Sequence, residues 1–264
     1  MREGRISKNL PNGHLPFRLT TASTPTEGLP ETSIRRIGPG TVECVVTTSL
    51  PTRYGRFRIS AYRANDSEVE HLALSFGDIS ELGNHQPVLV RLHSECLTGD
   101  VFGSARCDCG DQLSAGMKII ASAGRGILLY LRQEGRGIGL ANKLLAYAMQ
   151  DQGLDTVDAN AALGFPADRR EYGSAASILL HMGVTDVRLI TNNPAKVQGL
   201  EAHGVRVVER IGIEVPPNPT NLAYLRTKAL RMGHLLSLVD DPQAIEPDRH
   251  RNVQAANELP DERS

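Results

Sequence analysis

Alternating apolar and polar positions dominate the chain from about residue 42 to residue 92. Runs rich in Val, Ile, Leu and aromatic residues, bounded by turn-forming residues, are typical of strands. The pattern predicts four strands, which are Val42–Thr48, Phe57–Tyr62, His71–Phe76 and Pro87–Leu92. The first part of the folded region is therefore expected to be rich in β-structure.

The period changes after these strands, and helices begin to alternate with strands. Leu113, Met117 and Ile120 recur at helical spacing and predict a helix over Asp111–Ala123. Further helices are predicted at Leu140–Gln150, Ser174–Met182, from Pro194 onward and across Leu222–Leu238, with strands Gly126–Leu131, Val187–Thr191 and Val205–Arg210 between them. Such alternation indicates βαβ units. The predicted fold class is α/β, with a mixed sheet whose β-rich N-terminal portion is followed by alternating strands and helices.

Both ends of the chain lack these patterns. Residues 1–40 are rich in Pro, Gly, Ser and Thr, and residues 239–264 are polar and mildly acidic. Segments of this kind bury too little apolar surface to offset the entropy that ordering costs. We therefore expect a disordered N-terminal extension over 1–40, one folded domain over 41–238, and a disordered polar tail over 239–264.

Charge and length narrow the class of protein. The chain has 264 residues and a formal net charge of −1, from 29 Lys and Arg against 30 Asp and Glu. This balance gives no global attraction to nucleic acid or membrane, so an anion site must be built locally. No apolar run reaches the roughly 18 residues of a membrane span, and Met1–Lys8 has no apolar signal segment. We expect a cytoplasmic protein that binds neither nucleic acid nor membrane.

Three of the four cysteines crowd together. Cys96, Cys107 and Cys109 have the spacing C-x10-C-x-C, whereas Cys44 lies in a strand-like run and is expected in the core. Thiolates suit zinc, and three protein ligands leave a fourth position for a water whose pKa falls to roughly 7. Two alternatives remain: His93 completes a four-ligand structural site, or these are ordinary buried thiols.

Glycines surround the cysteine cluster. Gly99, Gly103 and Gly110 are expected to let the backbone turn sharply enough for the three sulfurs to converge.

A phosphate site is suggested where the strand Val187–Thr191 meets the next helix. Asn193 is a plausible helix cap, Pro194 a plausible first helical residue, and Lys196 adds a full positive charge to the helix N-terminus. The same features also occur in ordinary helix capping, so both interpretations stay open.

A second candidate is the glycine-rich segment Gln133–Leu140. It is neither G-x-G-x-x-G nor a Walker A loop, which excludes a Rossmann dinucleotide site and a P-loop. Arg136 could hold a phosphate and Glu134 a base edge, although a plain glycine-rich turn with a solvated arginine fits equally. Asp168–Glu171 is first of all a charged helix start.

The ordered set of these segments resembles a known family. HSECLTGD, RCDCG, RQEGRGIGLANKLLAYAMQDQG, DT, LGF, DRR and TNNPAK occur in the order typical of GTP cyclohydrolase II, and the similarity covers roughly residues 50–237. The resemblance implies that 41–238 is a catalytic domain of this kind. It implies one catalytic zinc per chain on Cys96, Cys107 and Cys109.

The resemblance also implies which residues contact GTP and carry the chemistry. The implied GTP contacts are Arg91, Leu92, His93, Ser94, Glu95, Gln112, Glu134, Gly135, Arg136, Thr156, Thr191 and Lys196. Asp168 matches the proton acceptor, Arg170 the nucleophile, and Tyr147 a tyrosine close to guanine and the reacting water. Guanidinium stays protonated and is a poor nucleophile, so a clamp on the α-phosphate is an equal alternative for Arg170.

The implied reaction is hydrolytic. Zinc-activated water attacks C8 of guanine, the ring opens, formate leaves, and pyrophosphate is lost from a triphosphate that pairs naturally with Mg²⁺. The product would be 2,5-diamino-6-(5-phosphoribosylamino)pyrimidin-4(3H)-one, at the first step of riboflavin biosynthesis, made by a monofunctional homodimer.

The sequence disfavours two rival functions. A non-catalytic zinc protein that binds nucleic acid is disfavoured by 4% aromatic residues and near-zero charge. A cyclohydrolase with a different product is disfavoured because Tyr147, Asp168 and Arg170 are all present.

Overall fold

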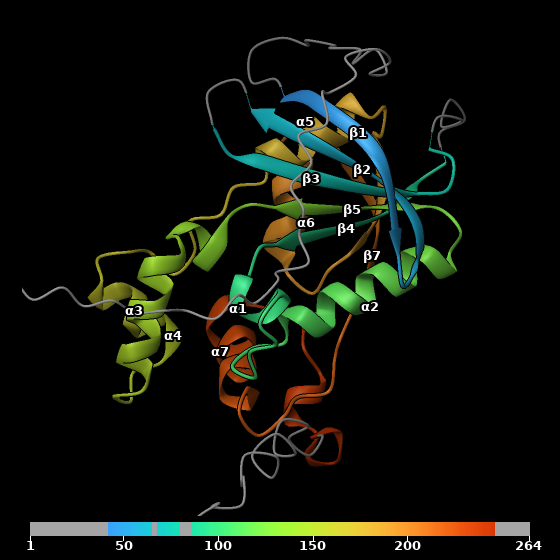
Figure 1. Ribbon diagram of the computed structural model, residues 1–264. Helices are drawn as coiled ribbons and strands as arrows, with labels where there is room; N and C mark the ends of the chain where they lie inside the picture. Colours follow the sequence, from blue (N-terminus) through green and yellow to red (C-terminus); the bar gives the residue numbers. More distant parts are fainter. Residues whose placement is uncertain (1–41, 65–67, 80–85, 246–264) are drawn as a thin grey trace, which may run out of the picture. The chain divides into compact units, whose positions relative to one another are not determined.

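Seven strands of the described chain form one mixed sheet. The computed structural model describes residues 42–64, 68–79 and 86–245 (Figure 1). The strands are β1 (Val42–Thr52), β2 (Gly55–Ala64), β3 (Glu70–Phe76), β4 (Val88–Ser94), β5 (Gly126–Leu131), β6 (Asp186–Ile190) and β7 (Arg206–Ile211). Their order across the sheet is β1-β2-β3-β5-β4-β6-β7. The prediction of a mixed α/β sheet with a β-rich N-terminal portion is confirmed.

The sheet has an antiparallel part and a parallel part. β1, β2 and β3 pair antiparallel, and β3 pairs antiparallel with β5. β5, β4, β6 and β7 run parallel to one another. Residues Val88–His93 of β4 are all buried, as expected for a parallel strand that is covered on both faces. The carboxyl ends of the parallel strands therefore meet at one edge of the sheet, the usual place for ligand sites in such folds.

Helices follow or connect the strands. They are α1 (Leu97–Asp100), α2 (Cys109–Ser122), α3 (Leu140–Gln150), α4 (Thr156–Ala162), α5 (Gly173–His181), α6 (Pro194–Glu201) and α7 (Leu222–Met232), with short 3-10 turns η2 (Glu134–Gly137), η3 (Leu238–Asp240) and η4 (Pro242–Ala244). None of the described helices is both long and apolar enough to cross a membrane.

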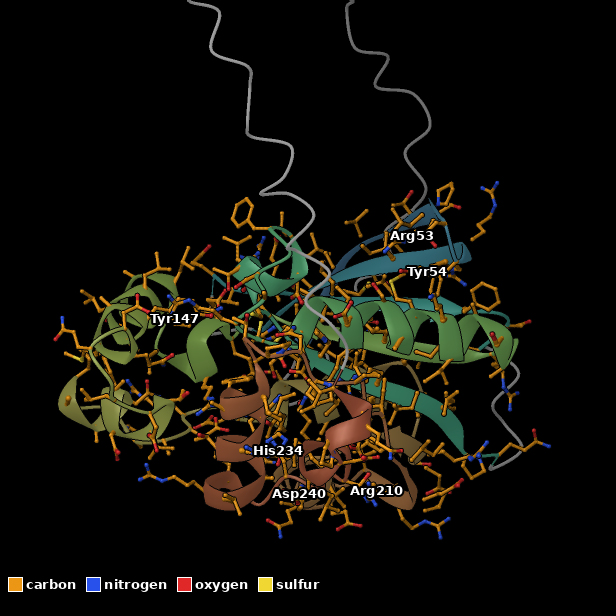
Figure 2. All side chains as sticks on the ribbon, turned by 90° about the horizontal axis from the view of Figure 1, so that it is seen from below. Arg53, Tyr54, Tyr147, Arg210, His234 and Asp240 are labelled. Carbon is orange, nitrogen blue, oxygen red and sulfur yellow. The ribbon has the colours of Figure 1, made fainter. Side chains whose placement is uncertain are left out.

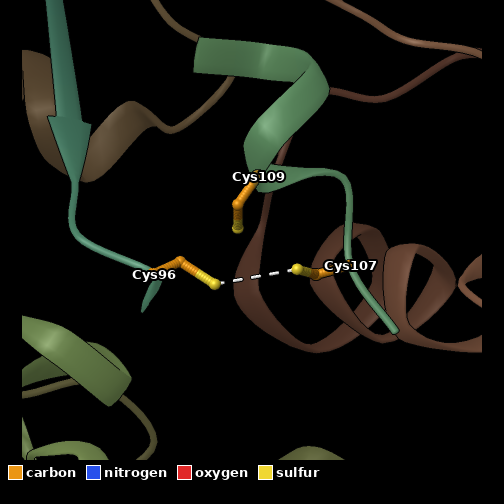
Figure 3. Close-up of side chains that lie close together, drawn as sticks. All are labelled: Cys96, Cys107 and Cys109. Atoms are coloured by element: carbon orange, nitrogen blue, oxygen red, sulfur yellow. Dashed lines mark hydrogen bonds between the residues drawn. The ribbon is translucent and has the colours of Figure 1, made fainter. Parts of the chain in front are cut away.

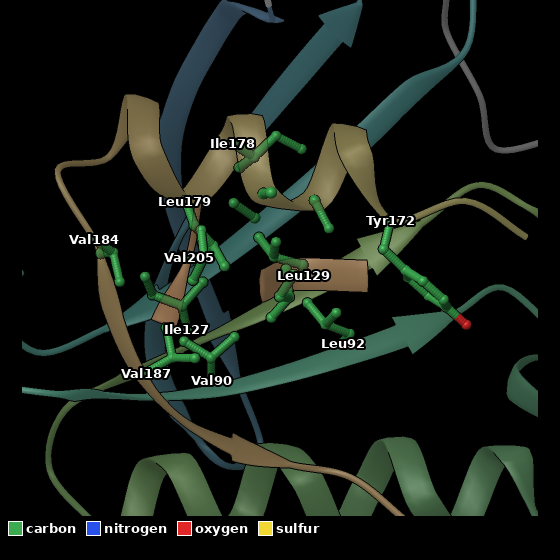
Figure 4. Close-up of a cluster of buried hydrophobic side chains, with 14 of the residues drawn as sticks. Val90, Leu92, Ile127, Leu129, Tyr172, Ile178, Leu179, Val184, Val187 and Val205 are labelled. Carbon is green, nitrogen blue, oxygen red and sulfur yellow. The ribbon is translucent and has the colours of Figure 1, made fainter. Parts of the chain in front are cut away.

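Two apolar clusters hold helices against the two faces of the sheet. On one face, Ile127 and Leu129 of β5 lie in a cluster with the fully buried Ile178 of α5 (Figure 4). On the other face, Leu128 of β5 belongs to a cluster with Ile120 of α2. Neighbouring residues of a strand point to opposite faces, so β5 is anchored from both sides and its end is held firmly.

Every predicted strand and long helix is present, but the last helix was predicted too long. The prediction ran from Leu222 to Leu238, whereas α7 ends at Met232 and Gly233 follows with a φ of 64°. Glycine adopts this left-handed conformation without steric cost, which makes it a common helix stop. α1, α4 and η2 were not predicted, because elements of one or two turns show no clear period.

The boundary of the predicted C-terminal tail also needs correction. The tail was predicted to begin at residue 239, yet Val239 is only 4% exposed and lies in η3, with η4 after it. The rest of that tail, residues 246–264, and the predicted extension over 1–40 lie outside the described residues.

Because β5 is packed on both faces, shortening one of its buried side chains should cost much stability. Leu129 is 0% exposed, so Leu129→Ala should lower the free energy of unfolding by about 2–5 kcal/mol in urea denaturation. Leu230 of α7 is 84% exposed, and Leu230→Ala is the matched control, with an expected change below about 0.5 kcal/mol. Equal losses in both variants would contradict the assignment of the core.

Candidate active site

A cavity opens where β4 and β5 end, and α2, α3, η2, α6 and α7 contribute to its walls. All but three of the predicted site residues line it: Arg91, His93, Ser94, Glu95, Cys96, Cys107, Cys109, Gln112, Glu134, Gly135, Arg136, Tyr147, Thr156, Arg170 and Lys196. Its empty space, open solvent at the mouth included, is about 940 Å³, which is within the size range of small-molecule sites.

The three clustered sulfurs converge at this cavity. The Sγ atoms of Cys96, Cys107 and Cys109 all lie within 4.8 Å of one another, and those of Cys96 and Cys107 are 3.7 Å apart (Figure 3). Zn–S bonds of about 2.3 Å in a tetrahedral arrangement place two sulfurs about 3.8 Å apart. Spacing and donor chemistry therefore both fit a zinc ion bound by three thiolates. Cys44 lies in β1, outside this group, and packs against the core as predicted.

Convergence of the sulfurs depends on two glycines that touch. A Cβ at Gly99 would lie 2.7 Å from Sγ of Cys107, and a Cβ at Gly110 would lie 2.4 Å from the carbonyl oxygen of Gly99. These two glycines therefore permit close approach of α1 to α2. The predicted sharp turn applies only to Gly103, whose φ is 63°.

Buried charge favours a thiolate at Cys96. Lys143 of α3 donates from Nζ to Sγ of Cys96 at 3.1 Å and to Oε1 of Glu134 at 2.8 Å. Hydrogen bonds from the Cys107 and Cys109 thiols, and then the charge of Lys143, hold the pKa of Cys96 well below its usual value. A thiolate is the form that binds zinc. The sequence did not identify Lys143 as a site residue. It is buried, although its neighbours Leu144 and Leu145 in the helix are exposed.

His93 is occupied elsewhere and is not a fourth metal ligand. Its Nε2 lies 2.9 Å from Oδ1 of Asp100, and the other carboxylate oxygen of Asp100 accepts from the backbone N–H of Cys96 at 3.0 Å. Tyr130 donates to the same oxygen at 2.8 Å. In the described part of the chain the candidate metal group comprises the three cysteines alone. The alternative in which His93 is a fourth metal ligand is therefore wrong, because the imidazole is bonded to Asp100 instead.

Two cations are buried at the end of β4. Arg91 is 4% exposed and donates to the carbonyl oxygen of Ile190 at 3.0 Å and to Oε1 of Gln112 at 2.7 Å. Lys196 is 7% exposed and donates to the carbonyl oxygen of Leu92 at 2.7 Å. Burial, followed by the charge of Arg91, lowers the pKa of Lys196. Buried cations of this kind favour an anionic ligand, which would relieve their desolvation.

The start of α6 is capped as predicted. The side chain of Asn193 accepts from the backbone N–H of Ala195 at 3.0 Å, and Pro194 stands in the first turn. Thr191 does not line the cavity, and its Oγ1 accepts from the N–H of Asn193 at 3.0 Å. Leu92 does not line it either, because its side chain belongs to the core. Thr191 supports the start of α6 through its hydroxyl, and Leu92 holds Lys196 through its carbonyl oxygen.

Arg136 is held in an unfavourable backbone conformation. Among the described non-glycine residues it alone has a positive φ, 59°, and Gly135 before it has a φ of 60°. Its Nη1 donates to the carbonyl oxygen of Ala167 at 3.4 Å, and its Nη2 is buried without a partner in the described structure. Strain of this kind concentrates at ligand sites, so Arg136 is placed to bind an acceptor that enters the cavity.

Arg170 lines the cavity and Asp168 holds it from outside. The Nε of Arg170 donates to both carboxylate oxygens of Asp168, at 2.9 Å and 3.1 Å. Burial opposes the charge of Arg170, but the hydrogen bonds to Asp168 outweigh it and raise the pKa of the guanidinium. The pair is therefore ionised, and Asp168 fixes the direction of the guanidinium plane.

Tyr147 of α3 stands across from α7 in the same cavity (Figure 2). Its hydroxyl lies 3.4 Å from Oγ1 of Thr98, and the Arg106 guanidinium is 5.0 Å from the centre of its ring. Burial raises the pKa of Tyr147, so the phenol is protonated and able to donate a hydrogen bond.

The sequence did not identify the part of the cavity wall that is formed by α7 and the residues just after it, called here the α7 wall. Tyr224, Lys228 and His234 all line the cavity. Lys228 is bonded from Nζ to Oδ1 of Asp108 at 3.1 Å, between two of the clustered cysteines. The usable signal was the spacing of Tyr224 and Lys228, four residues apart and hence on one face of the helix.

Comparison with known proteins agrees with this geometry. The sequence model of the family described as GTP cyclohydrolase II matches residues 43–212. The riboflavin biosynthesis protein RibBA of Salinispora tropica is 56% identical over 196 residues, 74% of this chain and 48% of that protein. RibBA of Mycobacteroides abscessus is 55% identical over 206 residues, 77% of this chain and 49% of that protein.

The chain spans about half the length of these curated relatives. Among solved structures, the two-domain 3,4-dihydroxy-2-butanone 4-phosphate synthase RibBX of A. baumannii matches with a TM-score of 0.40 and 22% identity, over 65% of this chain and 40% of that one. On the match over residues 43–212 and the identity to RibBA, this chain belongs to the GTP cyclohydrolase II family.

Proposed function

We propose that this chain is a zinc-dependent GTP cyclohydrolase II. It hydrolyses GTP to 2,5-diamino-6-(5-phosphoribosylamino)pyrimidin-4(3H)-one with release of formate and pyrophosphate, the first step of riboflavin biosynthesis. One observation carries the proposal: a three-cysteine cluster with the spacing that zinc needs and a group of buried cations line a single cavity. A nucleoside triphosphate needs both, because its base must reach the metal while its phosphates are neutralised.

Cationic side chains outnumber carboxylates in the lining of the cavity. Six cationic side chains line it against the carboxylates of Glu95 and Glu134. The cations are Arg91, Arg136, Lys143, Arg170, Lys196 and Lys228. Such an excess focuses a positive potential that attracts a polyanion. The proposal includes Mg²⁺ on the phosphate oxygens, since Mg²⁺ commonly binds through substrate phosphates.

The cysteine side of the cavity serves the ring chemistry. Cys96, Cys107 and Cys109 would hold the zinc ion, which when bound would supply a water activated near neutral pH. Tyr147, protonated and close to this side, donates a hydrogen bond to the guanine or to the reacting water. Glu134 is held by Lys143 and by the N–H of Leu97, at 2.8 Å and 2.6 Å, and its carboxylate accepts from the base edge.

Arg170 is proposed as a clamp on the α-phosphate. Its guanidinium is paired with Asp168 and its pKa is raised, which leaves no lone pair for attack on phosphorus. A planar guanidinium instead binds two phosphate oxygens at once. Asp168 does not line the cavity, so its proposed part is to orient the Arg170 guanidinium against the phosphate.

The proposal extends to a cytoplasmic homodimer. The cytoplasm is proposed because it is where GTP is available. Leu140, Leu144 and Leu145 of α3 are between 36% and 52% exposed, and clustered apolar side chains on one helix are a common feature of subunit contacts.

Loss of one sulfur should remove both metal and ring opening. In Cys107→Ser, a thiolate is replaced by a neutral hydroxyl, so zinc content by atomic absorption should fall from one per chain to near zero and formate release should stop. Cys44→Ser is the control, because Cys44 is free and lies outside the group; it should keep both. A Cys107→Ser protein with full zinc and normal formate release would defeat the assignment.

Loss of the clamp should separate phosphate chemistry from ring chemistry. Arg170→Ala should lose pyrophosphate release by a factor of about 100 or more while zinc stays bound, because no ligand has changed. Arg170→Lys keeps the charge without the fork and should rescue little. The neighbouring Arg169 is exposed, and Arg169→Ala should behave as wild type.

Formate measured in the same reactions orders the two steps. If phosphate cleavage must come first, Arg170→Ala also releases no formate; if ring opening is independent, a ring-opened triphosphate accumulates. Unimpaired pyrophosphate release in Arg170→Ala would rule out both the clamp and the nucleophile.

A further inference from the structure

The α7 wall extends the cavity beyond the residues that the family model matches. That match ends at residue 212, whereas Tyr224, Lys228 and His234 all line the cavity. Gly233, with its φ of 64°, turns the chain at the end of α7, and the backbone N–H of His234 donates to the carbonyl oxygen of Lys228 at 3.1 Å. His234 follows this turn and lines the cavity; Figure 2 labels it.

One nitrogen of His234 is buried without a partner. Its Nε2 has no hydrogen-bond partner among the described residues, and neither does Nη2 of Arg136 in the same cavity. Leaving a buried polar atom unpaired is costly, and such atoms in a native structure need an explanation. A ligand that brings hydrogen-bond acceptors into the cavity would satisfy both atoms.

The surroundings of His234 select an anion as that ligand. Burial, and then the positive charges of Lys228, Arg170, Lys196 and Arg136, lower the pKa of His234 to about 3. The imidazole is therefore neutral at physiological pH, and in its Nε2–H form it donates one hydrogen bond from that nitrogen. An unused donor in a cavity that these four cations also line favours phosphate oxygens as the ligand.

We propose that His234 is a phosphate-contact residue, whose Nε2 donates to an oxygen of the triphosphate at a subsite shared with Lys228 and Arg170. The identity of the ligand as GTP rests on the proposed function, whereas its chemical class, a di- or triphosphate, rests on the cavity. Lys228 also ties this subsite to the cysteine cluster, because its Nζ is bonded to Asp108.

Two half-ligands test the proposal by isothermal titration. Pyrophosphate carries only the phosphate part, and guanosine carries only the base and sugar. His234→Phe keeps a ring but removes the donor, so it should weaken pyrophosphate binding about tenfold or more and leave guanosine binding unchanged. His234→Gln can offer an N–H near the position of Nε2, and it should restore most of the affinity for pyrophosphate.

The control is His203→Phe. His203 is exposed, bonds through Nδ1 to the carbonyl oxygen of Gly199 at 2.8 Å, and does not line the cavity. It should leave the affinities for both half-ligands unchanged. Melting temperatures of all variants report whether each is folded, and His234→Ala, which also removes the donor, carries the test if His234→Phe is not.

The outcomes separate this proposal from the proposed function. Unchanged pyrophosphate affinity in His234→Phe overturns the subsite, and so does an equal loss for guanosine, which would indicate a collapsed wall. Wild-type protein that binds pyrophosphate through His234 but neither binds guanosine nor releases formate from GTP would support the subsite and refute the GTP reaction.

Discussion

The backbone contact between α1 and α2 is the constraint on which the site depends. Gly99 and Gly110 approach so closely that a Cβ on either would meet a sulfur or a carbonyl oxygen within 2.7 Å. This contact lets Cys96 and Cys107, which are eleven positions apart, present their sulfurs to the same point as Cys109. The Asp100 carboxylate then locks α1 to β4 and β5 through Cys96, His93 and Tyr130. The position of the cluster is therefore set by contacts within the fold itself.

Buried positive charge is the second feature that the fold maintains. Arg91 and Lys196 are less than 8% exposed, and burial lowers the pKa of both, that of Arg91 to about 10. Their desolvation disfavours the charged state and is compensated only partly by carbonyl oxygens. A polyanionic ligand would complete the compensation. Binding at this site should therefore also stabilise the fold, because the ligand binds the folded chain alone.

Local patterns in the sequence were sufficient for the parts of the site that are close together along the chain. The C-x10-C-x-C spacing identified the sulfurs, and the Asn-Pro pair identified the cap of α6, because both depend on backbone within a few turns. The period of apolar residues located every strand of the sheet. Strand order did not follow from it, because β5 inserts between β3 and β4 through contacts between distant residues.

The sequence pattern could not predict contacts between residues that are far apart along the chain. Lys228 meets Asp108 across 120 positions, and Lys143 meets Cys96 across 47. A helical period shows which face of a helix is apolar, not which distant loop its polar face meets. The positive φ of Arg136 was equally hidden, because the glycines beside it explained the turn without requiring strain at the arginine.

The central claim is that one cavity opens the guanine ring and cleaves the triphosphate. It is tested most directly by giving the zinc-loaded protein GTP labelled with ¹³C at C8, with Mg²⁺, and following carbon and phosphorus by NMR. The account predicts that the label appears in formate, with one pyrophosphate released for each formate. Label that stays in the purine ring while phosphate is released would contradict it.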